Sequence, residues 1–340
     1  MKTGISKCKI ESNHTREIFL RLAQRREIGL LALLCLMILV VSLVNPAFLS
    51  PGNIRDILVK NAPTAIAGCA ITLVIITGEI DISIGSLMGL LATIVGLLTS
   101  ASHAGLPVSV GILLTLLIGL GIGTLNGILV TYGRVPSIIV TLGMLTALRG
   151  INDLFMGGKW ITDLPPDLRF WGTGYLWGAP VSLWIALLVI LGCIILARET
   201  PLGRRIYAVG SNREAARLAG ISERRIKIFV FGLAGFLTGV ATLVSATRLS
   251  VIESGIGVGF ELLVVTCVVV GGTSISGGRG NIPGTLLGVL LLGMVGTVLI
   301  FLRLGEMSTY WERAIQGAFI LFAVFVDHLA NIKSRREGSI

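Results

Sequence analysis

Charged residues are scarce in this chain of 340 residues. Only 14% are Asp, Glu, Lys or Arg, whereas 54% are hydrophobic, and the mean hydropathy is +0.90. A soluble domain of this size has too little interior to bury so much apolar surface. Several apolar stretches reach the roughly 20 residues with which a helix crosses a hydrocarbon core of about 30 Å. The scarcity of charge therefore excludes a soluble globular protein and predicts an all-α polytopic membrane protein.

Cysteine and histidine are also few, with five and three residues. No pair of cysteines has the spacing of a metal site or a redox motif, and nothing indicates a disulfide framework. The three histidines lie at the edges of apolar spans or in the tails. We therefore predict no metal and no cofactor. The histidines are His14, His103 and His328, and the cysteines within apolar spans are Cys35, Cys69, Cys193 and Cys267.

A phosphate-binding loop is missing as well. Gly272 and Gly277 have the outer spacing of such a loop, but Gly278 and Arg279 follow where Lys and Ser or Thr are required. The Gly-Lys pair ending at Lys159 has no upstream glycine at the required distance. The chain therefore has no nucleotide motif of its own.

Basic residues are concentrated in three places, and the net charge is +10. Seven Lys or Arg precede the first apolar span, eight lie between Arg198 and Lys227, and three lie in the C-terminal tail. Positive-inside topology accounts for this distribution and predicts that both termini are cytoplasmic. Neither polar segment combines a basic face with stacking aromatic residues, so nucleic acid is excluded as a partner.

The apolar stretches predict a bundle of about ten transmembrane helices. Residues 1–27 form a basic cytoplasmic tail, 28–328 the transmembrane domain with a cytoplasmic loop at 198–225, and 329–340 a second cytoplasmic tail. The first apolar run is interpreted as a retained span because no small-residue cleavage site follows it. The spans at 136–155 and 259–272 are the weakest, and either is a candidate for a re-entrant or broken helix. The ten spans are 28–45, 57–77, 83–100, 107–131, 136–155, 180–197, 226–246, 259–272, 282–301 and 311–328.

One loop on the opposite side, residues 157–180, is long and rich in aromatic residues. The favoured interpretation is a belt at the membrane–water interface, where Trp and Tyr are enriched. A docking surface for an extracellular partner is the alternative.

A short helix is predicted inside the largest polar loop, from Asn212 to Gly220. Ser211 and Glu214 have the spacing of a capping box, and Gly220 is placed to stop the helix. Ala215, Leu218 and Ala219 form an apolar stripe, while two arginines, at 213 and 217, share another face. Such a helix is marginal alone in water and must pack against something. Packing on this protein itself and docking on a partner are equally compatible with the pattern.

Five segments resemble one family of transport proteins. The run Glu214-Ala215-Ala216-Arg217-Leu218-Ala219-Gly220 resembles the EAA-x-x-x-G signature of permease subunits of ATP-binding-cassette importers. The glycine-rich stretch 271–285 resembles that of monosaccharide-class permeases, those for ribose, rhamnose, arabinose and autoinducer-2. Residues 80–86, 125–127 and 136–143 match the same family, and the resemblance covers about 50–328. The loop at 157–160 is most similar to that of autoinducer-2 permeases.

The resemblance implies a coupling helix at 212–220, which would transmit the closure of ATP sites on a separate cytoplasmic ATPase subunit. It also implies a second permease copy or a similar chain, a periplasmic or extracellular substrate-binding protein, and residence in the bacterial inner membrane among lipid. The protein itself would not be an enzyme, and its cargo would be a sugar or sugar-like molecule. The coupling residues would be Ser211, Glu214, Ala215, Ala216, Arg217, Leu218 and Gly220.

Polar residues beside the apolar spans are candidates for a substrate path. Glu79 and Asp81 are interpreted as acids at the water interface, where Asp81 or Ser83 caps a helix. Asn126 can contact a polyhydroxylated substrate, but a hydrogen bond to a neighbouring helix beside a tight glycine face is favoured. The candidate path residues are Asp81, Ser83, Asn126, Thr141 and Thr266.

Two other classes of function remain as alternatives. An ion-coupled secondary transporter would normally carry acids or histidines in the middle of its spans. An intramembrane protease would need a nucleophile such as Ser274 or Ser276 with His328, but serine is common in glycine-rich turns. The permease is the favoured interpretation.

Overall fold

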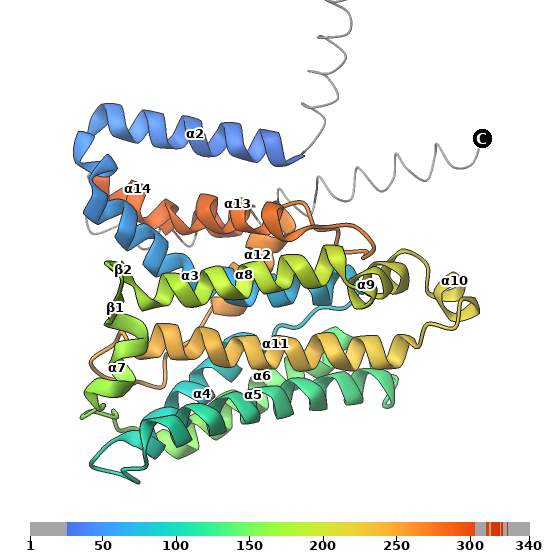
Figure 1. The fold of residues 1–340 in the computed structure, drawn as a ribbon, viewed down its shortest axis with the longest axis horizontal. Coiled ribbons are helices and arrows are strands. Elements are labelled where there is room, and N and C mark those ends of the chain that lie inside the picture. Colours follow the sequence, from blue (N-terminus) through green and yellow to red (C-terminus); the bar gives the residue numbers. More distant parts are fainter. Residues whose placement is uncertain (1–25, 303–310, 313, 320, 322–324, 326–340) are drawn as a thin grey trace, which may run out of the picture.

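The computed structural model describes residues 26–302, 311, 312, 314–319, 321 and 325. In this part of the chain most helices run along the long axis of an elongated bundle (Figure 1). Strands β1 (Tyr175–Leu176) and β2 (Ala179–Pro180) form a small antiparallel hairpin. The helices are α2 (Arg26–Val44), the 3-10 helix η1 (Pro46–Leu49), α3 (Pro51–Ile76), α4 (Ile84–Thr99), α5 (Val108–Thr131), α6 (Ser137–Met156), α7 (Pro166–Thr173), α8 (Val181–Glu199), α9 (Pro201–Ser211), α10 (Arg213–Leu218), α11 (Glu223–Ala246), α12 (Phe260–Val270), α13 (Ile282–Gly293) and α14 (Val295–Phe301).

Seven helical segments in the described residues are long and apolar enough to cross a membrane. They are α2, α3, α5, α6, α8, α11 and the continuous stretch of α13 and α14. This confirms an all-α polytopic membrane fold. The count of ten stays a prediction because part of the span at 311–328, including residues 322–324 and 326–328, lies outside the described residues. Most of the tail 1–27 and the whole tail 329–340 lie outside them too.

Two of the predicted spans are short helices. α4 has 16 residues and α12 has 11, so at about 1.5 Å per residue they measure about 24 Å and about 17 Å. Neither length reaches across a hydrocarbon core of about 30 Å. The weak span at 259–272 is therefore short, as anticipated. The other weak span, 136–155, is a continuous helix, α6. The second short helix is instead α4, within the predicted span at 83–100.

α3 forms the centre of the bundle. All side chains from Asn61 to Ile76 are buried, and α3 packs against α8, α11, α12 and α13. α2 is more apolar than α3 but exposes Leu36, Leu39 and Leu43. A helix that is apolar on every side belongs either in a protein core or against lipid. α3 meets the first condition and α2 meets the second.

A glycine face joins α5 to α11. A Cβ added to Gly123 would lie 2.3 Å from the carbonyl oxygen of Phe231, and one added to Gly235 would lie 2.1 Å from that of Gly119. These distances leave no room for any side chain between the two backbones. The predicted tight glycine face beside Asn126 is confirmed.

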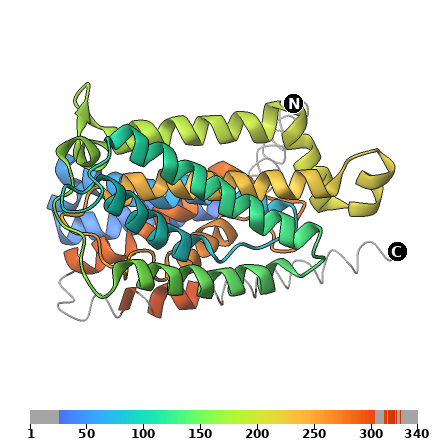
Figure 2. The same cartoon turned by 90° about the horizontal axis from the view of Figure 1, so that it is seen from below.

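The two ends of the bundle carry different structures. α10 projects beyond the other helices at one end, whereas α7 and the β1–β2 hairpin lie at the opposite end (Figures 1 and 2). The aromatic loop 157–180 contains this hairpin, with Trp160 and Trp177 exposed. The rings of Trp177 and Trp184 meet edge to face at 5.8 Å. Whether the loop is an interfacial belt or a docking surface stays a prediction.

Candidate coupling surface and translocation segment

α10 is the helix predicted in the polar loop. It runs from Arg213 to Leu218, and Gly220 has a φ of +77°, the left-handed conformation expected at the stop. The predicted capping box, however, is wrong. Asn212 is the N-cap, and its Oδ1 accepts a hydrogen bond of 3.0 Å from the backbone N–H of Ala215. Asparagine and serine are about equally favourable N-caps, so Asn212 can take the position that the sequence predicted for Ser211.

Ser211 and Glu214 have other partners. Ser211 is the last residue of α9, and its hydroxyl donates to the carbonyl of Gly278 at 3.4 Å. The carboxylate of Glu214 pairs with Arg217 one turn further along, at 3.0 Å. Both side chains of this pair are well exposed, so the pair contributes little to stability.

The apolar stripe of α10 is exposed, as are the charged side chains of the same helix. Within α10 only Ala216 is buried, at 4% exposure, and it packs into the core. Ala215, Leu218 and Ala219 are exposed, and Leu218 is 80% exposed. The stripe therefore turns away from this protein. An apolar helical face that its own chain does not cover favours docking over self-packing.

The glycine-rich stretch 271–280 packs on backbone at the same end of the bundle. The N–H of Gly278 donates to the carbonyl of Ile76 at 2.8 Å, and a Cβ added to Gly210 would lie 1.7 Å from that oxygen. The hydroxyl of Tyr207 donates to a carbonyl of the same stretch at 2.8 Å. Burial raises the pKa of Tyr207, so the hydroxyl retains the proton that it donates. Glycine therefore lets this stretch pack closely against the ends of α3 and α9.

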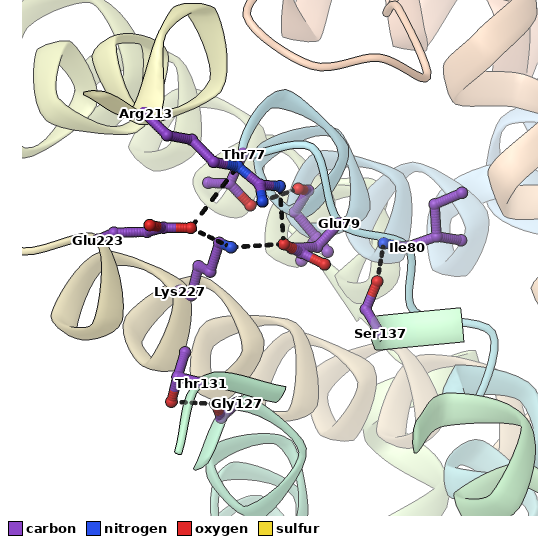
Figure 3. Close-up of polar contacts among 10 residues, drawn as sticks. Thr77, Glu79, Ile80, Gly127, Thr131, Ser137, Arg213, Glu223 and Lys227 are labelled. Atoms are coloured by element: carbon purple, nitrogen blue, oxygen red, sulfur yellow. Dashed lines mark hydrogen bonds and ion pairs between the residues drawn. The ribbon is translucent and has the colours of Figure 1, made fainter. Parts of the chain in front are cut away.

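Four charged side chains form a network beside α10 (Figure 3). Lys227 of α11 places its Nζ 2.6 Å from Glu79 Oε1 and also contacts Glu223 Oε1. Arg213 of α10 places its Nη2 3.1 Å from Glu79 Oε1 and its Nε 3.6 Å from Glu223 Oε1. The side chains of Glu79 and Lys227 are 9% and 7% exposed, whereas that of Arg213 is 53% exposed. This charge network is neutral overall, and its inner pair is buried.

The segment 77–83 joins α3 to α4 and contains a second polar cluster; we call it the translocation segment because Asp81 and Ser83 are candidate path residues. Asp81 Oδ1 accepts from the backbone N–H of Ser83 at 2.9 Å and from its hydroxyl at 2.6 Å. Asn126 of α5 donates through Nδ2 to the same hydroxyl oxygen at 3.0 Å. All three residues are buried. Three of the five predicted path residues therefore form one cluster, and the favoured hydrogen bond of Asn126 to a neighbouring helix is confirmed.

The prediction that Glu79 and Asp81 lie at the water interface is wrong. Glu79 is 7% exposed and Asp81 is 2% exposed. Ser83 occupies the N-cap position of α4, but its side chain makes no capping hydrogen bond. The translocation segment folds inward instead, and the N–H of Ile80 donates to the hydroxyl of Ser137 at 3.2 Å (Figure 3).

The two threonines among the predicted path residues lie in different places. Thr141 Oγ1 lies 3.3 Å from the carbonyl of Ile80 and donates to a carbonyl of its own helix at 2.9 Å. Thr266 lines a pocket of about 660 Å³ beside α12, together with Met88 and Glu312. A second pocket of about 600 Å³ is lined by all four residues of the charge network. Asp81 and Ser83 thus lie in the translocation segment, Asn126 and Thr141 contact it, and Thr266 lies elsewhere, beside α12.

None of the four residues of the charge network is among the site residues predicted from the sequence. Its signal in the sequence is the pair Glu223 and Lys227, spaced i, i+4 at the start of an apolar helix. Such spacing indicates a local pair, but the third member, Glu79, is far away in the chain. The nucleophile Ser274 of the protease alternative is buried in the glycine-rich turn, and His328 lies outside the described residues. Within the described residues, no group of three or more His, Cys, Asp or Glu is placed to hold a metal ion.

Comparison with known proteins identifies the family. The family model described as "Branched-chain amino acid transport system / permease component" matches residues 53–324. The chain belongs to this family. With its apolar helices, the permease is a multi-pass protein of the bacterial inner membrane.

Curated relatives of this permease are import proteins. The ribose import permease protein RbsC of Haemophilus influenzae is 38% identical over 304 residues, which cover 88% of this chain and 92% of that protein. The corresponding protein of Escherichia coli K12 is 37% identical over 306 residues, with the same coverage. The autoinducer 2 import system permease protein LsrC of Yersinia enterocolitica is 39% identical over 256 residues, which cover 75% of this chain and 69% of that protein. No solved structure matches the chain.

Proposed function

We propose that this permease is the membrane subunit of an ATP-driven importer and that α10 binds a separate ATPase subunit on the cytoplasmic side. The exposed apolar stripe of α10 supports this proposal, because Leu218 is 80% exposed on a helix that projects from the end of the bundle. A short capped helix transmits force better than an irregular loop. The lack of a phosphate loop in the sequence supports a motor on another chain.

The cargo in this proposal is a sugar or sugar-like molecule, and Asp81, Ser83 and Asn126 lie on its path. The relatives are named for ribose and autoinducer 2 import. The cluster offers both carboxylate acceptors and a hydroxyl, and Asn126 Oδ1 is buried without a hydrogen-bond partner among the described residues. Such an acceptor suits a hydroxyl donor on a polyhydroxylated molecule.

A second permease copy and a substrate-binding protein complete the proposed importer. The binding protein would deliver cargo at the end that carries α7 and the β1–β2 hairpin, opposite α10. Mass spectrometry of the ligand retained by the companion binding protein would test the cargo. Retention of a molecule without hydroxyl groups would contradict a sugar-like cargo.

Leu218→Asp tests the docking of α10. We expect the variant to insert and fold like the unmodified permease, because Leu218 is exposed, but to lose copurification with the ATPase subunit and ATP-driven uptake by at least tenfold. A charge in the centre of a desolvated apolar contact removes such binding. Glu214→Arg should also lower uptake without loss of the folded bundle.

Leu218→Met is the matched control, since it keeps the apolar contact and should retain copurification. Copurification and uptake at the unmodified level in Leu218→Asp would refute docking through α10.

One observation favours the ion-coupled alternative. Asp81 is buried and, within the described residues, has no cation as a partner, which is the environment of a proton-binding acid in a secondary transporter. Uptake by liposomes that contain only this chain, driven by a proton gradient without ATP, would support that function and contradict the importer.

A further inference from the structure

The charge network connects α10 directly to the translocation segment. Arg213 is the first residue of α10, and its guanidinium reaches Glu79, two residues before Asp81. Lys227 reaches the same carboxylate oxygen from α11. A single carboxylate therefore holds side chains from two elements that border the loop at 219–222. Any displacement of α10 acts on Glu79 through contacts that already exist.

The chain geometry at Glu79 allows this contact to move the segment. Gly78 has a φ of +78°, a left-handed conformation in which the chain leaves α3 and turns inward. A Cβ added to Gly78 would lie 3.3 Å from Arg213 Nη2, so the backbone itself borders the network. The far end of the segment is held by Ser83 and Asn126. The translocation segment is thus attached at both ends, and Asp81 lies between the two attachments.

Burial makes the inner pair the firm part of the network. Glu79 and Lys227 are both almost completely buried, whereas Arg213 is half exposed and screened by solvent. A buried cation and a buried carboxylate separate only at a large desolvation cost. The inner pair therefore remains closed when a displacement of α10 reaches Glu79 through Arg213, and it moves as a unit with α11 and the segment.

We propose that the ion pair of Glu79 and Lys227 transmits the displacement of α10 to the translocation segment, and that both are positioning residues for transport. This inference rests on the proposed function of α10. It assigns a role in coupling to two residues that touch neither the ATPase surface nor the Asp81 cluster.

A purely structural role for the pair makes a different prediction. Removal of one partner leaves the buried charge of the other with only a more exposed counterion, Arg213 or Glu223, and destabilises the protein in either case. Removal of both charges eliminates that cost. The double variant Glu79→Gln/Lys227→Met should therefore fold. If the pair is purely structural, the segment in this variant still responds to the ATPase; if the pair transmits the displacement of α10, it does not.

The test uses the complete permease reconstituted with its ATPase subunit in proteoliposomes. The five native cysteines are replaced by serine, and Ile82→Cys in the translocation segment reports the exposure of the segment through its rate of reaction with a maleimide. The rate is measured with and without ATP and vanadate, which trap the closed ATPase. ATP hydrolysis is measured in parallel, and the folded fraction is checked by size-exclusion chromatography.

In the otherwise unmodified permease we expect vanadate trapping to change the labelling rate at least fivefold. In Glu79→Gln/Lys227→Met the change should fall below twofold while ATP hydrolysis continues. Lys227→Arg should keep the fivefold change because it keeps the cation. Arg225→Met is the matched control on the same helix, since Arg225 is exposed and forms no ion pair within the described residues, and it should also keep the change.

A fivefold change of the labelling rate on vanadate trapping in the double variant would overturn this inference and leave the proposed function intact. The same conclusion would follow if trapping left the labelling rate unchanged in the otherwise unmodified permease while that permease binds and stimulates the ATPase. Failure of the unmodified permease to bind the ATPase would overturn the proposed function of α10 and this inference with it.

Discussion

Glu79 and Asp81 are two residues apart in one segment, and both are buried, yet their surroundings differ. Glu79 lies against two cations, Lys227 and Arg213. Asp81 Oδ1 accepts hydrogen bonds from the backbone N–H and the hydroxyl of Ser83, and the side-chain amide of Asn126 donates to that hydroxyl. The first carboxylate is compensated by charge and the second by neutral hydrogen bonds. The translocation segment thus combines a fixed anchor with an adaptable polar cluster.

The difference teaches which acid can serve a ligand. A carboxylate paired with a buried cation has its charge committed within the protein, and a neutral sugar gains little by approaching it. A carboxylate held by a hydroxyl can exchange that partner for a hydroxyl of the cargo with little loss. Glu79 therefore suits transmission of movement, and Asp81 suits contact with cargo.

The largest effect is expected at the anchor. Lys227→Met should lower the free energy of unfolding by about 3–5 kcal/mol, because it leaves the buried Glu79 with only the half-exposed Arg213. Titration with SDS in detergent micelles, followed by circular dichroism, measures it. Arg225→Met, which removes an exposed charge from the same helix, should change the value by less than about 0.5 kcal/mol. A loss below about 1 kcal/mol in Lys227→Met would show that the anchor is not held by charge.

An intermediate effect is expected at the amide that supports the cluster. Asn126→Ala should lower the free energy of unfolding by about 1–2 kcal/mol, since it removes the hydrogen bond to the buried Ser83 hydroxyl. The same titration applies, and Ser109→Ala, on an exposed position of α5, is the control. An unchanged value would mean that Asn126 does not hold the start of α4.

The smallest effect on stability is expected at Asp81 itself. Asp81→Asn keeps an acceptor for the Ser83 hydroxyl and strands no cation, so the free energy of unfolding should change by less than about 1 kcal/mol. Uptake of cargo should nevertheless fall about tenfold, because a hydrogen bond to a charged acceptor is stronger by about 1.4 kcal/mol than one to a neutral acceptor. If Asp81→Asn lowered the free energy of unfolding as much as Lys227→Met and left uptake per folded permease unchanged, the proposed difference between Glu79 and Asp81 would be wrong.

Local patterns in the sequence predicted local structure well. The bounds of α10 and its stop at Gly220 follow from caps and glycine, which act within one turn. The glycine contact of α5 follows from spacing along one helix. The cap itself was predicted one residue too early because Ser211 and Asn212 are both good caps, and only the extension of α9 decides between them.

Long-range burial could not be predicted in the same way. Residues 77–83 are polar enough to end a span, and hydropathy cannot distinguish an end in water from a turn inside the protein. Ser137 and Asn126, which receive the segment, lie on two later helices. The pairing of Glu79 with Lys227 likewise joins residues 148 positions apart. Both depend on how α3, α5, α6 and α11 pack, which no single window of sequence contains.

The glycine face between α5 and α11 has a mechanical consequence. Side chains at most helix contacts can change rotamer and let one helix slide past its neighbour, as in shear motions. Between Gly119, Gly123 and Gly235 there are no side chains to rearrange, because backbone meets backbone. We therefore expect α5 and α11 to move as one rigid body, which would carry Asn126 and Lys227 together.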